Sequence, residues 1–237
     1  MMQIIHYREL NEILSSNEIQ LFEKLQKIIY EINKYTNLTR LIEGDDYWIS
    51  QVYDSIWPFY LSQNKIFDGK KFIDIGSGCG FPGLAYAITH PNSEVYLVDS
   101  SRKKTDALKQ IIDELNLSKK IFVLNDRIEK IAHNASYRNI FDIGTTRAVG
   151  SPSTVAEYIL PMLNIGGSGL VYCGKWNNKD EDKIRNSLKI LKGSIADIKK
   201  TQLPNNKGER NIIFINPRQN CPNSYPRSIG KPAKYPL

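Results

Sequence analysis

The chain has few cysteines and few histidines, and both shortages exclude common kinds of site. Its three cysteines, Cys79, Cys173 and Cys221, lie far apart, are odd in number and show no CxxC spacing. They indicate neither a disulfide framework nor a zinc site, and a reducing cytoplasm is the expected compartment. Because there are only three histidines as well, we do not expect a histidine metal centre and predict no bound metal.

Long apolar stretches are also missing. No run approaches the ~20 residues needed to cross a membrane, and residues 1–6 lack the apolar core of a signal peptide. We therefore expect neither membrane insertion nor secretion. The 237 residues, 41% of them hydrophobic and 24% charged, are typical of one ordinary α/β domain with a modest appendage.

The net charge of +7 is unevenly distributed along the chain. Residues 1–60 carry 5 basic and 9 acidic side chains, whereas residues 175–237 carry 14 basic and 5 acidic ones. A basic C-terminal third favours contact with a polyanion such as RNA. The alternative is a lysine-rich surface that is merely solvated, and charge balance alone does not decide between the two.

Helical periodicity marks the N-terminal part of the chain. Apolar residues recur at helical spacing over 17–35, where Asn17 can cap the helix and Gln20 stands three residues later, as in a capping box. A second amphipathic stretch covers 46–61. We expect residues 1–65 to form a helical cap packed on the rest of the chain.

From residue 71 onward, strand and helix patterns alternate. The strands are expected at 71–75, 94–98, 121–124, 141–146, 168–173, 195–202 and 210–216. The helices are expected at 82–90, 102–116, 127–133, 152–164 and 179–191. Such alternation predicts a mostly parallel sheet of seven strands with helices on both faces, and the last two strands can form an antiparallel hairpin. This core would span 66–217. The tail 218–237, basic and rich in proline, is expected to be extended and mobile.

A glycine-dense turn follows the first of these strands. The turn contains four glycines within eight residues: Gly76, Gly78, Gly80 and Gly83. It directly follows a short apolar strand whose last two residues are the acidic Asp74 and the apolar Ile75. Each glycine costs roughly 0.5–1 kcal/mol relative to alanine where ordinary geometry would serve. The cluster therefore indicates a nucleotide-like ligand against the loop, the alternative being a tight turn that binds nothing.

Polar residues also stand at the ends of the other strands, where such sheets bind ligands. Asp99 follows the second strand, 21 residues after Gly78, and can accept hydrogen bonds from both hydroxyls of a ribose. Arg127-Ile128-Glu129 follow the third strand. Arg147 follows the fourth strand and Lys175 the fifth.

Two nucleotide ligands fit this pattern. Gly78-x-Gly80-x-x-Gly83 together with Asp99 matches the dinucleotide fingerprint of NAD enzymes. However, the acidic Asp74 just before the glycines would repel a pyrophosphate and attract a cation. S-adenosylmethionine carries a sulfonium and an ammonium and no phosphate, and a carboxylate about 4 Å away would contribute roughly 4 kcal/mol at an effective dielectric of 20. The sequence thus favours a methyltransferase over an oxidoreductase.

Across nearly its whole length the chain resembles the glucose-inhibited division protein B family, the small-subunit ribosomal RNA guanine-N7 methyltransferases. The residues that carry the resemblance are Asn37-Leu38-Thr39, Asp54-Ser55, Phe72 to Gly83, Leu97-Val98-Asp99-Ser100, Arg127-Ile128-Glu129, Arg147-Ala148, Gly208-Glu209-Arg210, Tyr225-Pro226-Arg227, Gly230-Lys231-Pro232 and Pro236-Leu237. The resemblance implies a Rossmann-like, class I S-adenosylmethionine-dependent methyltransferase fold. It also implies methylation of guanine N7 in 16S ribosomal RNA, in the cytoplasm, by an enzyme that we expect to be a monomer.

The resemblance further implies particular site residues. The cofactor would contact Gly76, Gly78, Phe81 and Arg147, Asp99 would take its ribose, and the backbone of Ile128 and Glu129 would flank its adenine. The chain departs from the family pattern where Gln51 replaces the usual histidine, where Lys175-Trp176 replaces Lys-Gly, and where Thr146 replaces serine. These departures fall on the side expected to face RNA.

The chemistry implied needs no general base, because guanine N7 has a lone pair and no proton. The enzyme would align the reactants and exclude water. We assign Arg147 to orienting cofactor or base, Lys175 to a phosphate or guanine O6, and the tail residues Arg227, Lys231 and Lys234 to RNA phosphates. An NAD-dependent oxidoreductase and a non-catalytic RNA-binding or assembly protein remain the alternatives.

Overall fold

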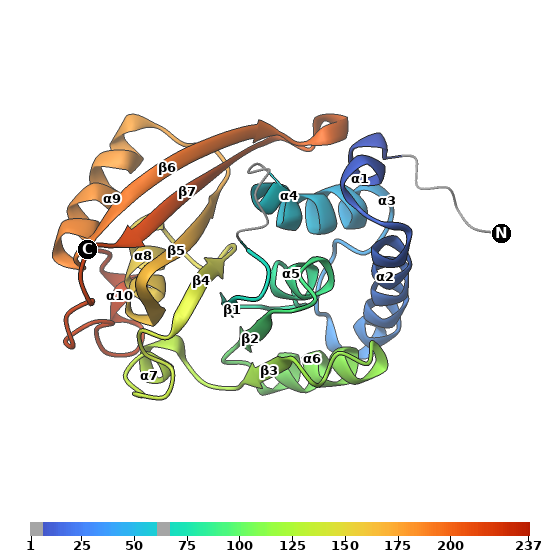
Figure 1. Cartoon of the computed structure of the whole chain (residues 1–237), viewed down its shortest axis with the longest axis horizontal. Coiled ribbons are helices and arrows are strands. Elements are labelled where there is room, and N and C mark those ends of the chain that lie inside the picture. Colours follow the sequence, from blue (N-terminus) through green and yellow to red (C-terminus); the bar gives the residue numbers. More distant parts are fainter. Residues whose placement is uncertain (1–6, 61–66) are drawn as a thin grey trace.

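A seven-stranded sheet forms the centre of the molecule, which is known here from a computed structural model describing residues 7–60 and 67–237 (Figure 1). The strands are β1 (Lys71–Ile75), β2 (Glu94–Val98), β3 (Ile121–Leu124), β4 (Phe141–Thr146), β5 (Leu163–Cys173), β6 (Gly193–Gln202) and β7 (Glu209–Pro217). The helices are α1 (Arg8–Ile13), α2 (Ser16–Thr36), α3 (Gly44–Tyr47), a π-helix (Trp48–Tyr53), α4 (Asp54–Tyr60), α5 (Gly83–Thr89), α6 (Arg102–Glu114), α7 (Ile128–Ile131), α8 (Pro152–Ile159), α9 (Asn178–Ile190) and α10 (Lys231–Lys234).

The strand order is β3-β2-β1-β4-β5-β7-β6. The pairs from β3 to β5 are parallel, whereas β7 runs antiparallel to both β5 and β6. The predicted class, a mostly parallel seven-stranded sheet ending in an antiparallel hairpin, is therefore confirmed. The order reverses between β1 and β4, so the loops after these two strands flank the crevice in which such sheets bind ligands.

Both faces of the sheet are covered because successive residues of a strand point to opposite sides. On β1, Phe72 joins a core made with α2, α4, α5 and α6, whereas Ile73 and Ile75 join a second core made with α7, α8 and α9. Figure 1 shows the two groups of helices on opposite sides of the sheet. Burial on both sides makes the sheet a rigid platform for the loops at its carboxyl edge.

The junction between α8 and β5 differs from the sequence prediction. A helix was expected over 152–164 and a strand over 168–173, but α8 ends at Ile159, a 3-10 turn spans Leu160–Met162, and β5 begins at Leu163. Pro161 explains the early end, since proline has no N–H to donate within a helix. Gly166 has φ +92° and lies where the pairing between β4 and β5 shifts register, so β5 continues through this irregularity.

The long helix of the N-terminal part is capped two residues before the predicted position. Ser15 and Glu18 form the capping box of α2: the Ser15 amide donates to Glu18 Oε2 at 2.7 Å, and the Glu18 amide donates to Ser15 Oγ. The Asn17 and Gln20 assignment was wrong, because the helix already includes Asn17.

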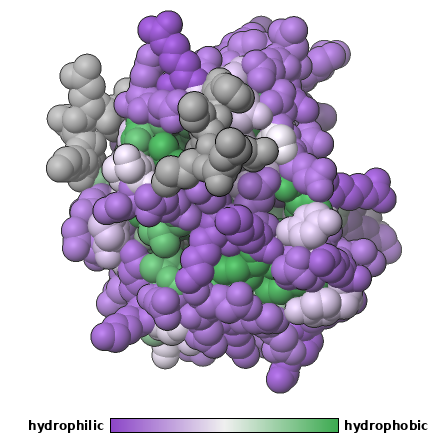
Figure 2. All heavy atoms as spheres, turned by 90° about the vertical axis from the view of Figure 1, so that its right-hand side faces the viewer, coloured by the Kyte–Doolittle hydropathy of each residue, from purple (hydrophilic) through white to green (hydrophobic). Residues whose placement is uncertain are grey.

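The α2 side of the molecule is largely hydrophilic, with apolar side chains visible in recesses between polar ones (Figure 2).

The second predicted helix, 46–61, is divided in three. It consists of part of α3, a π-helix at Trp48–Tyr53, and α4, with residue 61 outside the described residues. The wider π-helical turn places Gln51 and Asp54 in buried positions, at 2% exposure each. Single π-turns of this kind often occur at functional sites. The predicted boundary between residues 65 and 66 also falls outside the described residues, and the division into three domains stays a prediction.

The tail is ordered on the core, which corrects the expectation that it is mobile. Arg138 donates to the carbonyl oxygens of Cys221, Pro222 and Tyr225, at 2.8, 3.1 and 2.9 Å. His133 lies 2.8 Å from the carbonyl oxygen of Pro226. The proline content that suggested disorder instead leaves fewer backbone N–H groups to satisfy, and core side chains bind the remaining carbonyls.

In the described part of the chain, no helix is both long and apolar enough to span a membrane.

Candidate active site

A cavity of about 830 Å³ opens at the carboxyl ends of the parallel strands. Its wall combines the loops after β1 to β5 with residues from the N-terminal part of the chain, and with Arg210 of β7 and Ala233 of the tail. The predicted residues that line it are Gly76, Gly78, Phe81, Asp99, Ile128 and Arg147. Residues up to 71 positions apart in sequence thus share one cavity, as the parallel-sheet interpretation requires.

The glycine loop is fixed to β2 by Ser77. The amides of Gly76 and Ser77 both donate to the carbonyl oxygen of Val98, at 2.8 and 3.0 Å, and Ser77 Oγ accepts from the Val98 amide at 3.1 Å. Gly76 has φ +76°, and a Cβ there would lie 2.5 Å from Val149 Cγ2. Only glycine suits this position, because any side chain would be both strained and blocked by the neighbouring loop.

Asp99 stands at the tip of β2 with its carboxylate against the glycine loop. Oδ2 accepts from the Gly78 amide at 3.0 Å and Oδ1 accepts from the Ser101 amide at 2.9 Å. These bonds fix the orientation of the side chain, which is about one-tenth exposed and lines the cavity. An ionised carboxylate has about four lone-pair sites, so Asp99 keeps acceptors for the two hydroxyls of a ribose.

Ile128 and Glu129 behave differently at the tip of β3. Ile128 lines the cavity, but Glu129 does not, and its side chain is turned into the protein. Glu129 Oε1 accepts from the Gly230 amide at 2.9 Å and lies 3.2 Å from both Arg127 Nη2 and Tyr158 Oη. Burial raises the pKa of Glu129, but these hydrogen bonds outweigh it and hold the pKa below its usual value. Its carboxylate therefore anchors protein segments, and only its backbone remains a candidate for the adenine.

Asp74 binds neighbouring protein segments and does not line the cavity. Its side chain is 1% exposed and is not part of the cavity wall. One oxygen accepts from Thr145 Oγ1 at 3.0 Å and the other from the Gly83 amide at 3.1 Å. Asp74 thus ties β1 to β4 and to the start of α5. Burial raises its pKa to about 6. The structure therefore gives Asp74 no direct contact with the cavity, and the attraction between its carboxylate and a bound cation stays a prediction.

Arg147 lines the cavity and at the same time binds the π-helix above it. Its Nη1 donates to the carbonyl oxygen of Ser50 at 3.0 Å and lies 3.5 Å from Asp54 Oδ2, while its Nη2 donates to Gln51 Oε1. Gln51 in turn donates from Nε2 to Thr39 Oγ1 at 3.2 Å and to Cys79 Sγ at 3.4 Å. The guanidinium therefore joins β4, the π-helix and the glycine loop through one network.

Arg210 is a site residue that the sequence argument named only as part of a motif. It lines the cavity and binds Asp54 through Nε. The motif Gly208-Glu209-Arg210 was a signal, but without the fold nothing indicated that β7 would lie against the cap. Lys175, by contrast, is exposed and is not part of the cavity wall, although the adjacent Gly174 is. Its assigned role in RNA contact stays a prediction.

The cavity wall offers hydrogen-bond acceptors, the guanidinium groups of Arg127, Arg147 and Arg210, and apolar surface. Phe81 lies edge-on to Tyr47 at 5.9 Å between ring centroids and closes the wall under the cap. Among the described residues, no cluster of three or more His, Cys, Asp or Glu side chains could hold a metal ion. An oriented acid at a strand tip, a bare glycine loop and apolar walls suit an adenosine-containing ligand.

Comparisons with known proteins identify relatives along most of the chain. The model of the family described as "rRNA small subunit methyltransferase G" (GidB) matches residues 18–213. A protein named ribosomal RNA small subunit methyltransferase G from Prochlorococcus marinus (strain MIT 9515) is 60% identical over 230 residues, which cover 97% of this chain and 96% of that protein. The protein of the same name from strain NATL2A is 45% identical over 231 residues, covering 98% and 93%.

Solved structures show the same fold at much lower sequence identity. An O-methyltransferase from Bacillus cereus, in complex with SAH, aligns with a TM-score of 0.59 at 16% identity over 88% of this chain and 95% of that chain. The mitomycin 7-O-methyltransferase aligns with a TM-score of 0.56 at 10% identity over 86% and 69%. These likenesses establish the fold, a Rossmann-like class I methyltransferase fold, as predicted. From the family model and the close relatives, the chain belongs to the rRNA small subunit methyltransferase G family.

Proposed function

We propose that this chain transfers a methyl group from S-adenosylmethionine to N7 of a guanine in small-subunit ribosomal RNA. Membership of the family confirms the predicted class of enzyme, an S-adenosylmethionine-dependent rRNA methyltransferase. The observation that carries the finer proposal is the position of Asp99, fixed by the Gly78 amide at 3.0 Å, on the wall of a cavity that three arginines also line. This arrangement supports an adenosine site beside a cationic site.

The residues present fit the methyl donor. Asp99 retains lone pairs for a ribose, Gly76 leaves bare backbone where the loop meets the cavity, and Ile128 offers an apolar surface for a purine. When bound, S-adenosylmethionine supplies a methyl group on a positively charged sulfur. The chain itself needs to hold the two reactants in line and to keep water away from them.

The cavity wall suits a reaction that needs no proton transfer. Among the described residues that line it there is no histidine. His90 stacks on Tyr86 at 4.3 Å between ring centroids, and His133 binds the tail, so both are occupied elsewhere. Guanine N7 carries a lone pair and no proton, so positioning alone is sufficient for its attack. The absence of a histidine base from this wall supports N7 over a position that must first lose a proton.

The RNA side is the cationic part of the cavity. Arg147 and Arg210 share the single carboxylate of Asp54, which leaves one positive charge in excess at the wall. The basic residues of 175–237 extend the positive field beyond the cavity. We propose that these groups receive the phosphates and the target guanine of a small subunit, and that the enzyme acts as a monomer in the cytoplasm.

The proposal is tested by supplying the purified chain with methyl-labelled S-adenosylmethionine and small subunits from a strain lacking the gene. We expect label in the RNA, and mass spectrometry of digested RNA should place it on N7 of one guanine. Label on another atom would overturn the N7 assignment alone. Absence of label, with NAD bound in a parallel titration, would instead favour the oxidoreductase. RNA binding without transfer would favour the assembly protein.

A further inference from the structure

The C-terminal segment, residues 227–237, is held by a buried ion pair at its start. Arg227 Nη2 lies 2.7 Å from Glu157 Oε2, and its Nε donates to both carboxylate oxygens at 3.0 and 3.2 Å. Glu157 is fully buried on α8, and the Arg227 side chain is 18% exposed. The Arg227 amide also donates to Glu157 Oε1 at 2.8 Å. Because an unpaired buried carboxylate is costly, this contact fixes the path of the segment.

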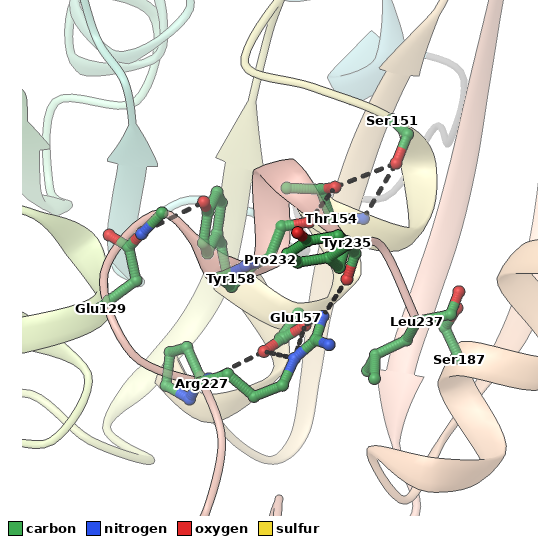
Figure 3. Close-up of polar contacts among 12 residues, drawn as sticks. Glu129, Ser151, Thr154, Glu157, Tyr158, Ser187, Arg227, Pro232, Tyr235 and Leu237 are labelled. Carbon is green, nitrogen blue, oxygen red and sulfur yellow. Dashed lines mark hydrogen bonds and ion pairs between the residues drawn. The ribbon is translucent and has the colours of Figure 1, made fainter.

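From that anchor the C-terminal segment reaches one wall of the cavity. The Gly230 amide donates to Glu129 Oε1 at 2.9 Å, and Tyr158 Oη lies 3.2 Å from the same oxygen (Figure 3). Glu129 directly follows Ile128, whose side chain lines the cavity, and Tyr158 lines it as well. Glu129 is 2% exposed, so its position depends on these partners and on Arg127.

The same segment also contacts the start of α8, next to a second part of the cavity wall. Thr154 Oγ1 donates to the carbonyl oxygen of Pro232 at 3.0 Å (Figure 3). At the start of α8, Ser151 Oγ accepts a hydrogen bond from the Thr154 amide. The turn before Ser151 includes Ala148 and Val149, both on the cavity wall. The chain end is fixed too, because Ser187 Oγ donates to the carbonyl oxygen of Leu237 at 2.9 Å.

We propose that the C-terminal segment is a positioning element of the S-adenosylmethionine site and not an RNA-binding arm. It contacts the loop at Ile128–Glu129 through Gly230, it contacts the start of α8, which follows the loop at Ala148–Val149, through Pro232, and Ala233 itself forms part of the wall. The inference rests on the proposed function, since it names the ligand of that site. It reverses the role that the charge of the tail suggested.

The polar groups of the segment support this assignment. The Arg227 guanidinium, the Gly230 amide and the Pro232 carbonyl all face protein groups. The remaining basic side chains, Lys231 and Lys234, are exposed, and Lys234 Nζ lies 5.3 Å from the centroid of the Tyr235 ring. The segment thus directs its specific polar contacts to α8 and to the loop at Ile128–Glu129, whereas its two lysines face solvent.

The test compares the intact chain with three variants. A chain ending at Ile229 lacks the Gly230 and Pro232 contacts, and Thr154→Val removes only the hydroxyl that binds Pro232. The double variant Lys231→Ala, Lys234→Ala is the control, since it removes charge and leaves the contacts with the cavity loops. Binding of S-adenosylhomocysteine is measured by calorimetry, RNA binding by filter assay at fixed salt, and folding by thermal unfolding.

We expect the shortened chain to bind S-adenosylhomocysteine at least tenfold more weakly, with RNA affinity within twofold of the intact chain. Thr154→Val, which loses the hydrogen bond to Pro232 and the contact with Ser151 Oγ, should raise KM for S-adenosylmethionine by about fivefold with kcat unchanged at saturation. The lysine control should bind S-adenosylhomocysteine as tightly as the intact chain.

Two results would overturn the inference. In the first, the shortened chain folds and binds S-adenosylhomocysteine as tightly as the intact chain but loses RNA affinity. That result would assign the C-terminal segment to RNA binding. The other is an unchanged KM in Thr154→Val, which decides the matter even if the shortened chain does not fold. If the intact chain itself fails to bind S-adenosylhomocysteine, the proposed function fails; if it binds and the variants match it, only the present inference fails.

Discussion

Arg210 on β7 donates from Nε to both carboxylate oxygens of Asp54, at 3.0 and 3.1 Å, although 156 positions separate the two residues. Asp54 is 2% exposed, and this partly buried pair joins β7 to the N-terminal helices. Arg147 lies 3.5 Å from the same carboxylate. Two cations thus surround the one carboxylate of Asp54 at the cavity wall, which leaves positive charge available for an RNA substrate.

Arg147→Ala should reduce methyl transfer more than it reduces stability. In this variant Asp54 keeps its ion pair with Arg210. Loss of the hydrogen bonds of Arg147 should therefore lower the free energy of unfolding by about 1–3 kcal/mol. The π-helix would lose its tie to β4, and misplacement of a reacting group by 1 Å can lower the rate about 100-fold. Single-turnover kinetics and denaturant unfolding measure the two effects. Full activity would remove Arg147 from the site, and Lys109→Ala on the exposed face of α6 is the control.

Asp99→Ala should weaken binding of S-adenosylhomocysteine by at least tenfold. The variant loses a charged acceptor for two ribose hydroxyls, and hydrogen bonds to charged groups contribute about 1.5–3 kcal/mol each. Calorimetric titration gives the affinity, with Asp106→Ala as a matched control, since Asp106 pairs only with exposed residues of its own helix. Equal affinities for Asp99→Ala and the intact chain would show that the carboxylate does not touch the ligand.

Asp74→Asn should change the pH dependence of stability without changing ligand binding. Burial raises the pKa of Asp74 from 3.8 to about 6. Between these pH values the unfolded chain loses the proton first, so the free energy of unfolding falls as pH rises. The asparagine variant lacks this loss, which amounts to about 3 kcal/mol at 1.36 kcal/mol per pH unit. Urea unfolding of both proteins from pH 4 to 7 measures the difference.

The same variant separates two roles for Asp74. Its amide can still accept from Gly83 and donate to Thr145, so the loop geometry should persist. If the carboxylate instead attracted the bound cation directly, as the sequence argument supposed, Asp74→Asn would weaken S-adenosylmethionine binding at pH 7. We expect unchanged binding, because the side chain is not part of the cavity wall.

Lys175→Ala should weaken RNA binding and leave cofactor binding unaffected. Lys175 is exposed next to Gly174, at the rim of the cavity. One lost phosphate contact should lower the slope of log affinity against log salt concentration by about 0.7 for single-stranded RNA. Filter binding at several salt concentrations gives the slope. An unchanged slope would leave Lys175 as a solvated lysine, and Lys183→Ala on α9 provides a comparison.

Much of the fold and part of the site could be predicted because the information is local. The glycine spacing, Asp99 and Arg147 occupy strand ends, and parallel strands bring their carboxyl ends to one edge whatever the details of packing. For the same reason the predicted positions Gly76, Gly78, Phe81 and Ile128 share one cavity. The predicted start of α2 and the predicted end of α8 were less accurate. Near Ser15 and Pro161, several neighbouring residues are equally plausible ends for a helix, and the local sequence does not decide between them.

By itself, the sequence determined the alternation of strands and helices, the parallel sheet and the glycine loop, since backbone propensity and hydrophobic period act over a few residues. Only the tertiary structure decided how side chains far apart are used. It turned Asp74 and Glu129 inward to satisfy buried amides and packed a tail that looked mobile. It also joined Arg210 to Asp54 across the cavity. The free-energy cost of leaving a polar group unpaired depends on how deeply the fold buries it. It also depends on neighbours that are distant in sequence, which no local pattern reveals.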